Sequence, residues 1–149
     1  MALTQYNAWR LEVNDSASVV TSISELRRKI ANASSLSEGR IWLAADAGPR
    51  PIWQRVLGAK RYVELFFSIE WCAEYASLIF HDENASEHRV IDQSQPVSPS
   101  IEIRSKISHD EVKPCPVDEC MVKNRGFLAI DEFLSNGAKP QWVTYRFVR

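Results

Sequence analysis

The stretch that decides the fold runs over residues 118–149 and reads DECMVKNRGFLAIDEFLSNGAKPQWVTYRFVR. Phe127, Ile130 and Leu134 recur at helical spacing within it, and Lys123, Asp131 and Glu132 are left for the solvent side. Apolar residues spaced three and four apart form one stripe along a helix, which is typical of a helix that packs against a core. The stretch therefore predicts a C-terminal amphipathic helix.

The residues around this helix predict its two ends and the element that follows. The side chain of Asp118 can cap the first amides and suits the positive end of the helix dipole. Gly137 can adopt the left-handed conformation that ends a helix, and Pro140 prevents a restart. The alternation from Trp142 to Val148 then predicts a closing strand.

Length and composition predict one globular domain over residues 1–149. The chain is 45% hydrophobic and 25% charged, which is ordinary for a protein of this kind. Its formal net charge of −1 argues against general nucleic-acid binding, which needs a clustered basic excess. Residues 1–15 lack the pattern of a signal peptide, and no apolar run approaches the ~20 residues of a membrane helix. We therefore expect a cytoplasmic protein without membrane association, and the odd count of three cysteines fits a reducing compartment.

Upstream, the periodicity alternates between strand and helix. Residues 9–13 alternate as a strand, and Ser22 with Glu25 forms a capping box for a helix that extends to Ile30. Residues 41–45 form a short buried strand that we expect to break at 46–51. Residues 52–57 fit a helical turn, but Gly58 follows closely, so their conformation stays open.

The middle of the chain predicts several strands joined by short turns. They cover residues 62–70, 75–80, 87–91 and 101–107. The expected fold class is α+β, with a mostly antiparallel sheet of about five strands and with the N-terminal and C-terminal helices packed on one face.

Candidate catalytic and metal-binding residues do not form a recognisable motif. Cys115 and Cys120 have the spacing of half a zinc site, but a second pair at ligand spacing is missing. His81 and His88 flank a turn, and neither is a sequence neighbour of a cysteine. Since the chain also lacks a Gly-rich phosphate loop and a G-x-S-x-G elbow, we expect no enzyme activity, no metal and no cofactor.

Charge is distributed unevenly along the chain. Residues 62–100 contain seven acidic side chains and one basic side chain, Arg89, which leaves 12 acidic and 17 basic residues elsewhere. A negative surface formed by these strands would suit a basic partner, although the same acids could simply solvate the sheet. With Trp71 as a possible aromatic hot spot, the candidate binding residues are Glu64, Glu70, Trp71, Glu74, Asp82, Glu83, Glu87 and Asp92.

Counting by twos along residues 62–70 places Phe66 on the same strand face as Glu64 and Glu70. An exposed Phe66 would add to such an interface. A helix that covered this face would instead make Phe66 part of the core.

The C-terminal stretch resembles a family of bacterial immunity proteins, the antitoxins of polymorphic and contact-dependent toxin systems. The run GFLAIDEFLSNGAKPQWVTY, residues 126–145, matches the family's helix, turn and final strand, and residues 63–90 resemble its central hairpin more faintly. The match covers about the last two-thirds of the chain. Residues 48–60 look like additional material, and residues 146–149 extend past the family's usual end.

This resemblance implies a protein that binds and neutralises a cognate toxin domain in the producing cell. The family is often paired with nucleic-acid deaminases, and a nuclease is the other expected toxin. We expect a monomer in a one-to-one complex in preference to an obligate oligomer, and the charge count suggests the acidic segment as the surface that blocks the toxin's cleft.

Two other functions remain open at the level of sequence. One is an adaptor or chaperone-like binding module for a secreted effector. The other is a small metal-dependent hydrolase that uses Cys115, Cys120 and a histidine.

Overall fold

The computed structural model describes residues 3–49, 52–57, 61–92, 101–104, 112–115 and 119–148. Its elements are η1 (Leu3–Gln5), β1 (Trp9–Val13), β2 (Ser16–Val20), α1 (Ile23–Ser34), β3 (Glu38–Pro49), α2 (Ile52–Val56), β4 (Arg61–Cys72), β5 (Tyr75–His81), β6 (Glu87–Ile91), β7 (Ile101–Arg104), β8 (Val112–Cys115), β9 (Met121–Val122), α3 (Lys123–Asn136) and β10 (Thr144–Phe147).

One large sheet organises the fold, and the predicted α+β class is confirmed. The strand order is β10-β6-β5-β4-β3-β1-β2, with β9 paired to β5, and every pairing is antiparallel. The sheet has eight strands among the described residues, rather than the expected five or so. β7 pairs with β8 in a separate two-stranded sheet, so the strand predicted at 101–107 does not join the main sheet. Residues 105–107 lie outside the described part.

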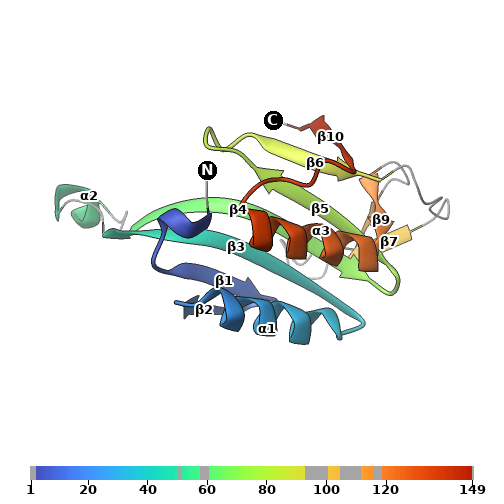
Figure 1. Cartoon of the computed structure of the whole chain (residues 1–149), viewed down its shortest axis with the longest axis horizontal. Helices are drawn as coiled ribbons and strands as arrows, with labels where there is room; N and C mark the ends of the chain where they lie inside the picture. The colour runs from blue at the N-terminus through green and yellow to red at the C-terminus, as the bar shows by residue number, and fades with distance from the viewer. Residues whose placement is uncertain are drawn as a thin grey trace.

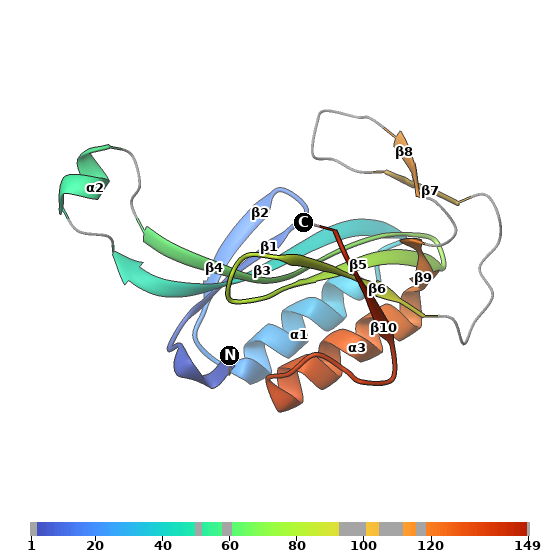
Figure 2. The same ribbon diagram turned by 90° about the horizontal axis from the view of Figure 1, so that it is seen from above.

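The two long helices lie side by side on one face of the sheet, as the sequence predicts (Figure 1). Figure 2 shows the β7–β8 hairpin on the other side, where β7 contacts β4 and β5. The helix-covered face therefore contains the main core, and the opposite face is covered only in part by described residues.

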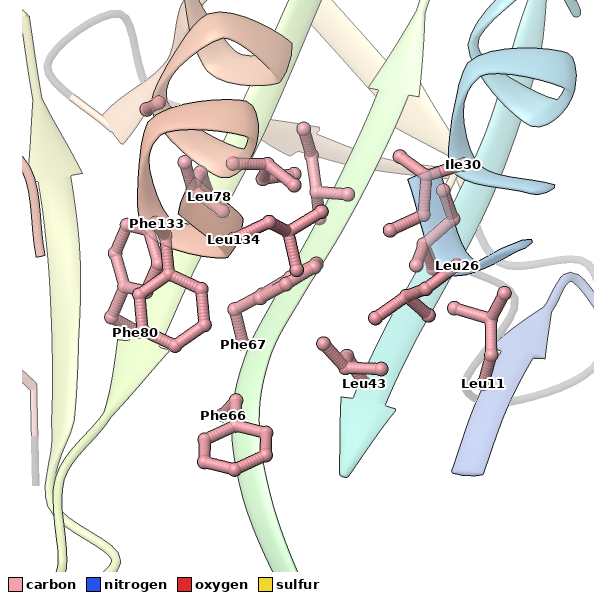
Figure 3. Packing of buried hydrophobic residues seen from close by; sticks show 14 of the residues in the cluster. Leu11, Leu26, Ile30, Leu43, Phe66, Phe67, Leu78, Phe80, Phe133 and Leu134 are labelled. Atoms are coloured by element: carbon pink, nitrogen blue, oxygen red, sulfur yellow. The ribbon is translucent and has the colours of Figure 1, made fainter. Parts of the chain in front are cut away.

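Aromatic and aliphatic side chains from both helices and the central strands fill this core (Figure 3). The Phe133 ring from α3 lies 5.3 Å from the Phe80 ring of β5 and 6.0 Å from the Phe67 ring of β4. Leu26 and Ile30 project from α1 toward Leu43 on β3. Apolar burial of this kind is the main source of stability in a domain of this size.

The helix ends follow the expected local chemistry with one exception. The amide of Glu25 donates to Ser22 Oγ at 3.2 Å, as the capping box predicts. Gly137 ends α3 with φ of 69°, and its amide donates to the Phe133 carbonyl at 2.8 Å. The start of α3 differs, because it begins at Lys123 after Val122 without a side-chain cap, and Asp118 lies outside the described residues.

Two strands differ from the sequence predictions. β2 is not predicted, because Ser16, Ala17 and Ser18 carry no apolar alternation, yet it pairs with β1 over its whole length. β3 continues to Pro49 although a break is expected from Asp46. β1 pairs with β3 only as far as Ala45, so β3 is an edge strand beyond that point. Pro49 therefore removes no backbone hydrogen bond to a strand on that side.

β3 and β4 therefore extend beyond the sheet as a two-stranded arm. Asp46 and Pro49 pair with Val63 and Arg61, and α2 lies at the tip. Figures 1 and 2 both place α2 away from α1 and α3. Residues 52–57, whose conformation the sequence leaves open, thus form a short helix and a turn at the end of this arm.

Candidate functional site: an acidic cleft at the base of the arm

A β-bulge in β4 determines which way its acidic side chains point. Leu43 of β3 pairs with Phe67, whereas the next residue, Ala44, pairs with Leu65, so Phe66 is an extra residue in the ladder. Two adjacent residues of a bulge project toward the same side of a sheet. Phe66 and Phe67 are accordingly both buried on the helix-covered face, at 5% and 0% exposure.

The bulge makes one of the sequence predictions wrong. Strict alternation predicts that Glu64, Phe66 and Glu70 share a face. Instead, Glu64 accompanies Phe66 on the helix-covered face, and Glu70 points to the opposite face. The physical reason is that a one-residue shift in pairing reverses the side-chain alternation beyond it.

Three of the predicted acids converge on one cleft beside the base of the arm. Glu64 comes from β4, and Asp82 and Glu83 come from the turn between β5 and β6. The volume of the cleft is about 410 Å³. Its remaining lining residues are Phe66, His81, Asn84, Phe133, Gly137, Ala138 and Lys139. We call this feature the acidic cleft; aromatic rings from β4 and α3 lie among its three carboxylates.

Tyr6 links the N-terminal segment to the acidic cleft. Its hydroxyl donates to Glu64 Oε2, and its ring lies 6.0 Å from the Phe66 ring in an edge-on arrangement. The hydrogen bond to Glu64 raises the pKa of Tyr6 to about 12, with further contributions from burial and from the charges of Glu64 and Glu83. The charges of both carboxylates thus reach the Tyr6 hydroxyl, so the two side chains contribute to one negative region.

Asp82 both shapes the turn and supplies charge. Its Oδ1 accepts backbone N–H bonds from Asn84 and Ser86, each at 2.9 Å, and its Oδ2 lies 3.1 Å from His88 Nε2. The bond to His88, followed by the backbone bonds, lowers the pKa of Asp82 to about 2. The carboxylate therefore stays ionised throughout the neutral pH range, and the turn that carries Glu83 is held in place.

The other predicted acids lie elsewhere. Glu70 and Glu87 line a cavity of about 340 Å³ on the opposite sheet face, together with Arg89. Glu74 is exposed in the turn between β4 and β5. Asp92 is buried and forms an ion pair with Arg125. The acidic middle of the sequence is therefore not one surface, because its strands have two faces and its turns lie at both ends of the sheet.

Trp71 is a core residue and not a surface hot spot. It is 1% exposed, and its Nε1 donates to the Leu36 carbonyl at 3.0 Å. β4 extends to Cys72, so the turn expected at residues 71–74 begins later and Trp71 stays on the core face. Gly39 lies opposite on β3, where a Cβ atom would come within 2.5 Å of the indole ring. The tryptophan thus requires a glycine as its neighbour.

The described residues contain no group of three His, Cys, Asp or Glu side chains arranged to hold a metal ion. Cys72 is free, whereas Cys120 is disulfide-bonded, in contrast to the expectation of reduced cysteines. The side chain of Cys115 lies outside the described part. Of the two candidate histidines that flank the turn, His88 is paired with Asp82.

Comparison of the sequence with models of known protein families and with curated proteins finds no match to this chain. Among the described residues, the helices are too short or too polar for any of them to cross a bilayer.

Sequence reasoning misses several residues of the acidic cleft. The lining residues Phe133 and Lys139, and Tyr6, which bonds to Glu64, come from segments far from β4 in the chain, and no local pattern connects them. One usable signal is the Phe66–Phe67 pair, because two consecutive large apolar residues in an otherwise alternating strand are typical of a bulge.

Proposed function

We propose that this chain is an immunity protein that neutralises a cognate toxin domain by binding a basic element of the toxin in the acidic cleft. The observation that carries the proposal is the convergence of Glu64, Asp82 and Glu83, from two separate elements, beside the rings of Phe66 and Phe133. The resemblance of residues 126–145 to the immunity family supports the same function.

The chemistry of the acidic cleft suits an arginine or lysine side chain. The carboxylates can accept charge-assisted hydrogen bonds from the cationic head group. The rings can contact the apolar stem and, for arginine, stack on the guanidinium plane. Toxins that act on nucleic acid bind phosphates with basic residues, so a protein that occupies those residues competes with the substrate. The proposed toxin is a deaminase or a nuclease.

This function needs no catalytic step in the immunity protein itself. It requires a stable one-to-one complex in the cytoplasm of the producing cell, formed quickly enough to precede damage. Opposite charges on the two partners accelerate encounter and exclude wrong partners. Because the low pKa of Asp82 keeps that carboxylate ionised, we expect binding to weaken with added salt much more than with a change of pH near neutrality.

The test uses the toxin domain encoded beside this chain and measures its dissociation constant by calorimetry. The variant Glu64→Gln with Glu83→Lys neutralises one cleft charge and reverses another, while Gln can still accept the hydrogen bond from Tyr6. We expect binding to weaken by about 100-fold or more, as for other close charge pairs at interfaces. The variant should also lose protection of cells that express the toxin.

The matched control is Glu74→Lys, because Glu74 is exposed in the turn between β4 and β5, away from the acidic cleft. It should change the dissociation constant by less than about 3-fold, as expected for a charge outside the contact. An unchanged dissociation constant for the cleft variant, with the fold verified by circular dichroism, would contradict the proposal.

One observation favours the second candidate function, an adaptor or chaperone-like module for a secreted effector. Ile52, Trp53, Val56 and Leu57 at the tip of the arm are all exposed, as expected of a surface that binds a partially folded chain. Co-expression with the neighbouring gene product separates the two functions. Protection of cells against that product supports immunity, whereas secretion of the product without protection supports the adaptor.

A further inference from the structure

The tip of the arm exposes a contiguous apolar cluster. Ile52 is 71% exposed, Trp53 64%, Val56 80% and Leu57 79%. The spacing of these four residues puts them on one side of α2 and the turn that follows it. Single exposed apolar residues are ordinary in soluble proteins, but four adjacent ones at the end of a projecting arm mark an interaction site.

The sequence around the tip is also basic. Arg50, Arg55, Lys60 and Arg61 carry positive charge, and no acidic residue occurs between Asp46 and Glu64. A five-residue helix is too short to be stable in water without packing partners. The tip therefore fits a partner surface that combines apolar area with negative charge.

This chain carries such a surface itself. The acidic cleft presents the carboxylates of Glu64, Asp82 and Glu83 beside the rings of Phe66 and Phe133. Its volume of about 410 Å³ is within the range of pockets that enclose a large side chain. The tip and the acidic cleft are thus complementary in both charge and polarity.

The tip cannot fill the acidic cleft of its own chain, since the paired strands of the arm hold α2 away from the sheet (Figure 2). Glu64, in the cleft, lies only three residues after Arg61, the first residue of β4, or about 10 Å along the arm at ~3.3 Å per residue. Two arms packed antiparallel around a two-fold axis would therefore place each tip beside the cleft of the other copy. Such an arrangement is closed, and it makes both contacts at once.

We propose that the chain forms a two-fold dimer by reciprocal exchange of its arms, with the tip of each copy seated in the acidic cleft of the other. The partner for the exposed apolar cluster is thus a second copy. This inference does not depend on the proposed toxin, because it concerns the purified chain alone. In the proposed dimer, the tip of the second copy occupies the acidic cleft before any other partner binds there.

The experiment measures molar mass against concentration by sedimentation equilibrium. The wild-type chain should dimerise, and Trp53→Ser with Leu57→Ser should raise the dimer dissociation constant by more than about 100-fold, because both copies lose hot-spot side chains. Glu64→Gln with Glu83→Lys should do the same from the cleft side. The matched control is Val19→Ser, a similarly exposed apolar residue on β2 at the far edge of the sheet, which should leave dimerisation unchanged.

Mixing the two variants provides the decisive measurement. The tip variant retains its cleft, and the cleft variant retains its tip, so equal amounts should form a heterodimer held by one contact. A wild-type chain that stays monomeric at about 100 µM, or a dimer that the tip variant leaves unchanged, overturns the proposal. A monomer whose tip instead binds the toxin domain, or vesicles of phosphatidylserine, would assign the tip to that partner and equally overturn it.

Discussion

Trp71 and Trp53 lie in two regions with opposite properties. Trp71, near the C-terminal end of β4, is 1% exposed, packs against the Phe127 ring at 5.2 Å and donates to Leu36. Trp53, at the tip of the arm that begins with the same strand, is 64% exposed. The body of the molecule supplies Phe127 of α3, the Leu36 carbonyl and the space at Gly39 to its tryptophan, whereas the described part of the arm supplies no covering element.

This difference shows that hydrophobic character alone does not decide burial. An apolar side chain is buried when the chain also provides a complementary surface, and at Trp71 that surface includes the space left by Gly39. Where the chain provides none locally, a cluster of exposed apolar side chains such as the one around Trp53 indicates a contact outside the domain. The comparison therefore separates residues that stabilise the fold from residues available for binding.

The largest effect should be the difference in the free energy of unfolding between variants that truncate Trp71 and Trp53. Trp71→Ala removes a buried aromatic side chain and should lower the free energy of unfolding by about 4 kcal/mol. Trp53→Ala should change it by less than about 0.5 kcal/mol in dilute, monomeric protein, because little buried surface is lost. Urea denaturation of both variants checks the contrast, and equal destabilisation would remove the distinction between the body and the arm.

Ion pairs should show the same contrast at smaller magnitude. The Asp92 side chain is 2% exposed beside Arg125, whereas Asp131 is 59% exposed beside Arg27. Arg125→Met removes the Arg125 cation from beside a buried carboxylate and should cost about 3 kcal/mol. Arg27→Met should cost less than about 1 kcal/mol. Denaturation curves measure both, and a double variant with Asp92→Asn should recover part of the larger loss.

The smallest effect concerns the acidic cleft and alkaline pH. The pKa of Tyr6 is about 12 in the folded chain, above the ordinary 10.0, so its hydrogen bond to Glu64 stabilises the fold fully below pH 10. That contribution is lost as the pH rises through 12, because the ionised tyrosinate can no longer donate. Glu64→Gln removes the negative charge, although the amide oxygen can still accept from Tyr6, so one tyrosine titration should move part of the way back toward pH 10 in ultraviolet absorbance spectra.

Tyr145 provides the internal control for this titration. Its pKa is also about 12, but burial is the main cause and the charge of Glu132 contributes less. Glu64→Gln should leave the Tyr145 titration in place. If both high titrations shifted together, the cause would be a general loosening of the fold rather than the missing carboxylate.

Much of the fold was predictable from periodicity. α1, α3, β1 and β4 all follow strong apolar patterns, and the Ser22 cap and the Gly137 stop are local signals that act through the backbone. β2 was not predictable because its small polar residues give no alternation, although its pairing with β1 supplies the order. The length of β3 depends on pairing with β4, which overrides the local preferences of Asp46 and Pro49.

The candidate site was less predictable for a different reason. The charge count found Glu64, Asp82 and Glu83, but it could not separate them from Glu70, because one bulge decides which face each acid of β4 occupies, nor from Glu87 on β6. Similarly, Asp92 looks like a surface acid until Arg125 is placed beside it by α3. Charge composition detects an acidic segment, whereas the direction of each carboxylate is a property of strand register.

The bulge at Phe66 also sets how residues can be gained or lost near the acidic cleft. Phe66 has no partner of its own on β3, so removing it would cost one ring and leave Glu64 and Glu70 on their present faces. Adding a residue to β3 between Leu43 and Ala44 would instead give Phe66 a partner and rotate the base of the arm by half a turn. Glu64 would then leave the acidic cleft without any change in its own identity. A single insertion on a neighbouring strand would thus remove the candidate site while the body of the protein stays folded.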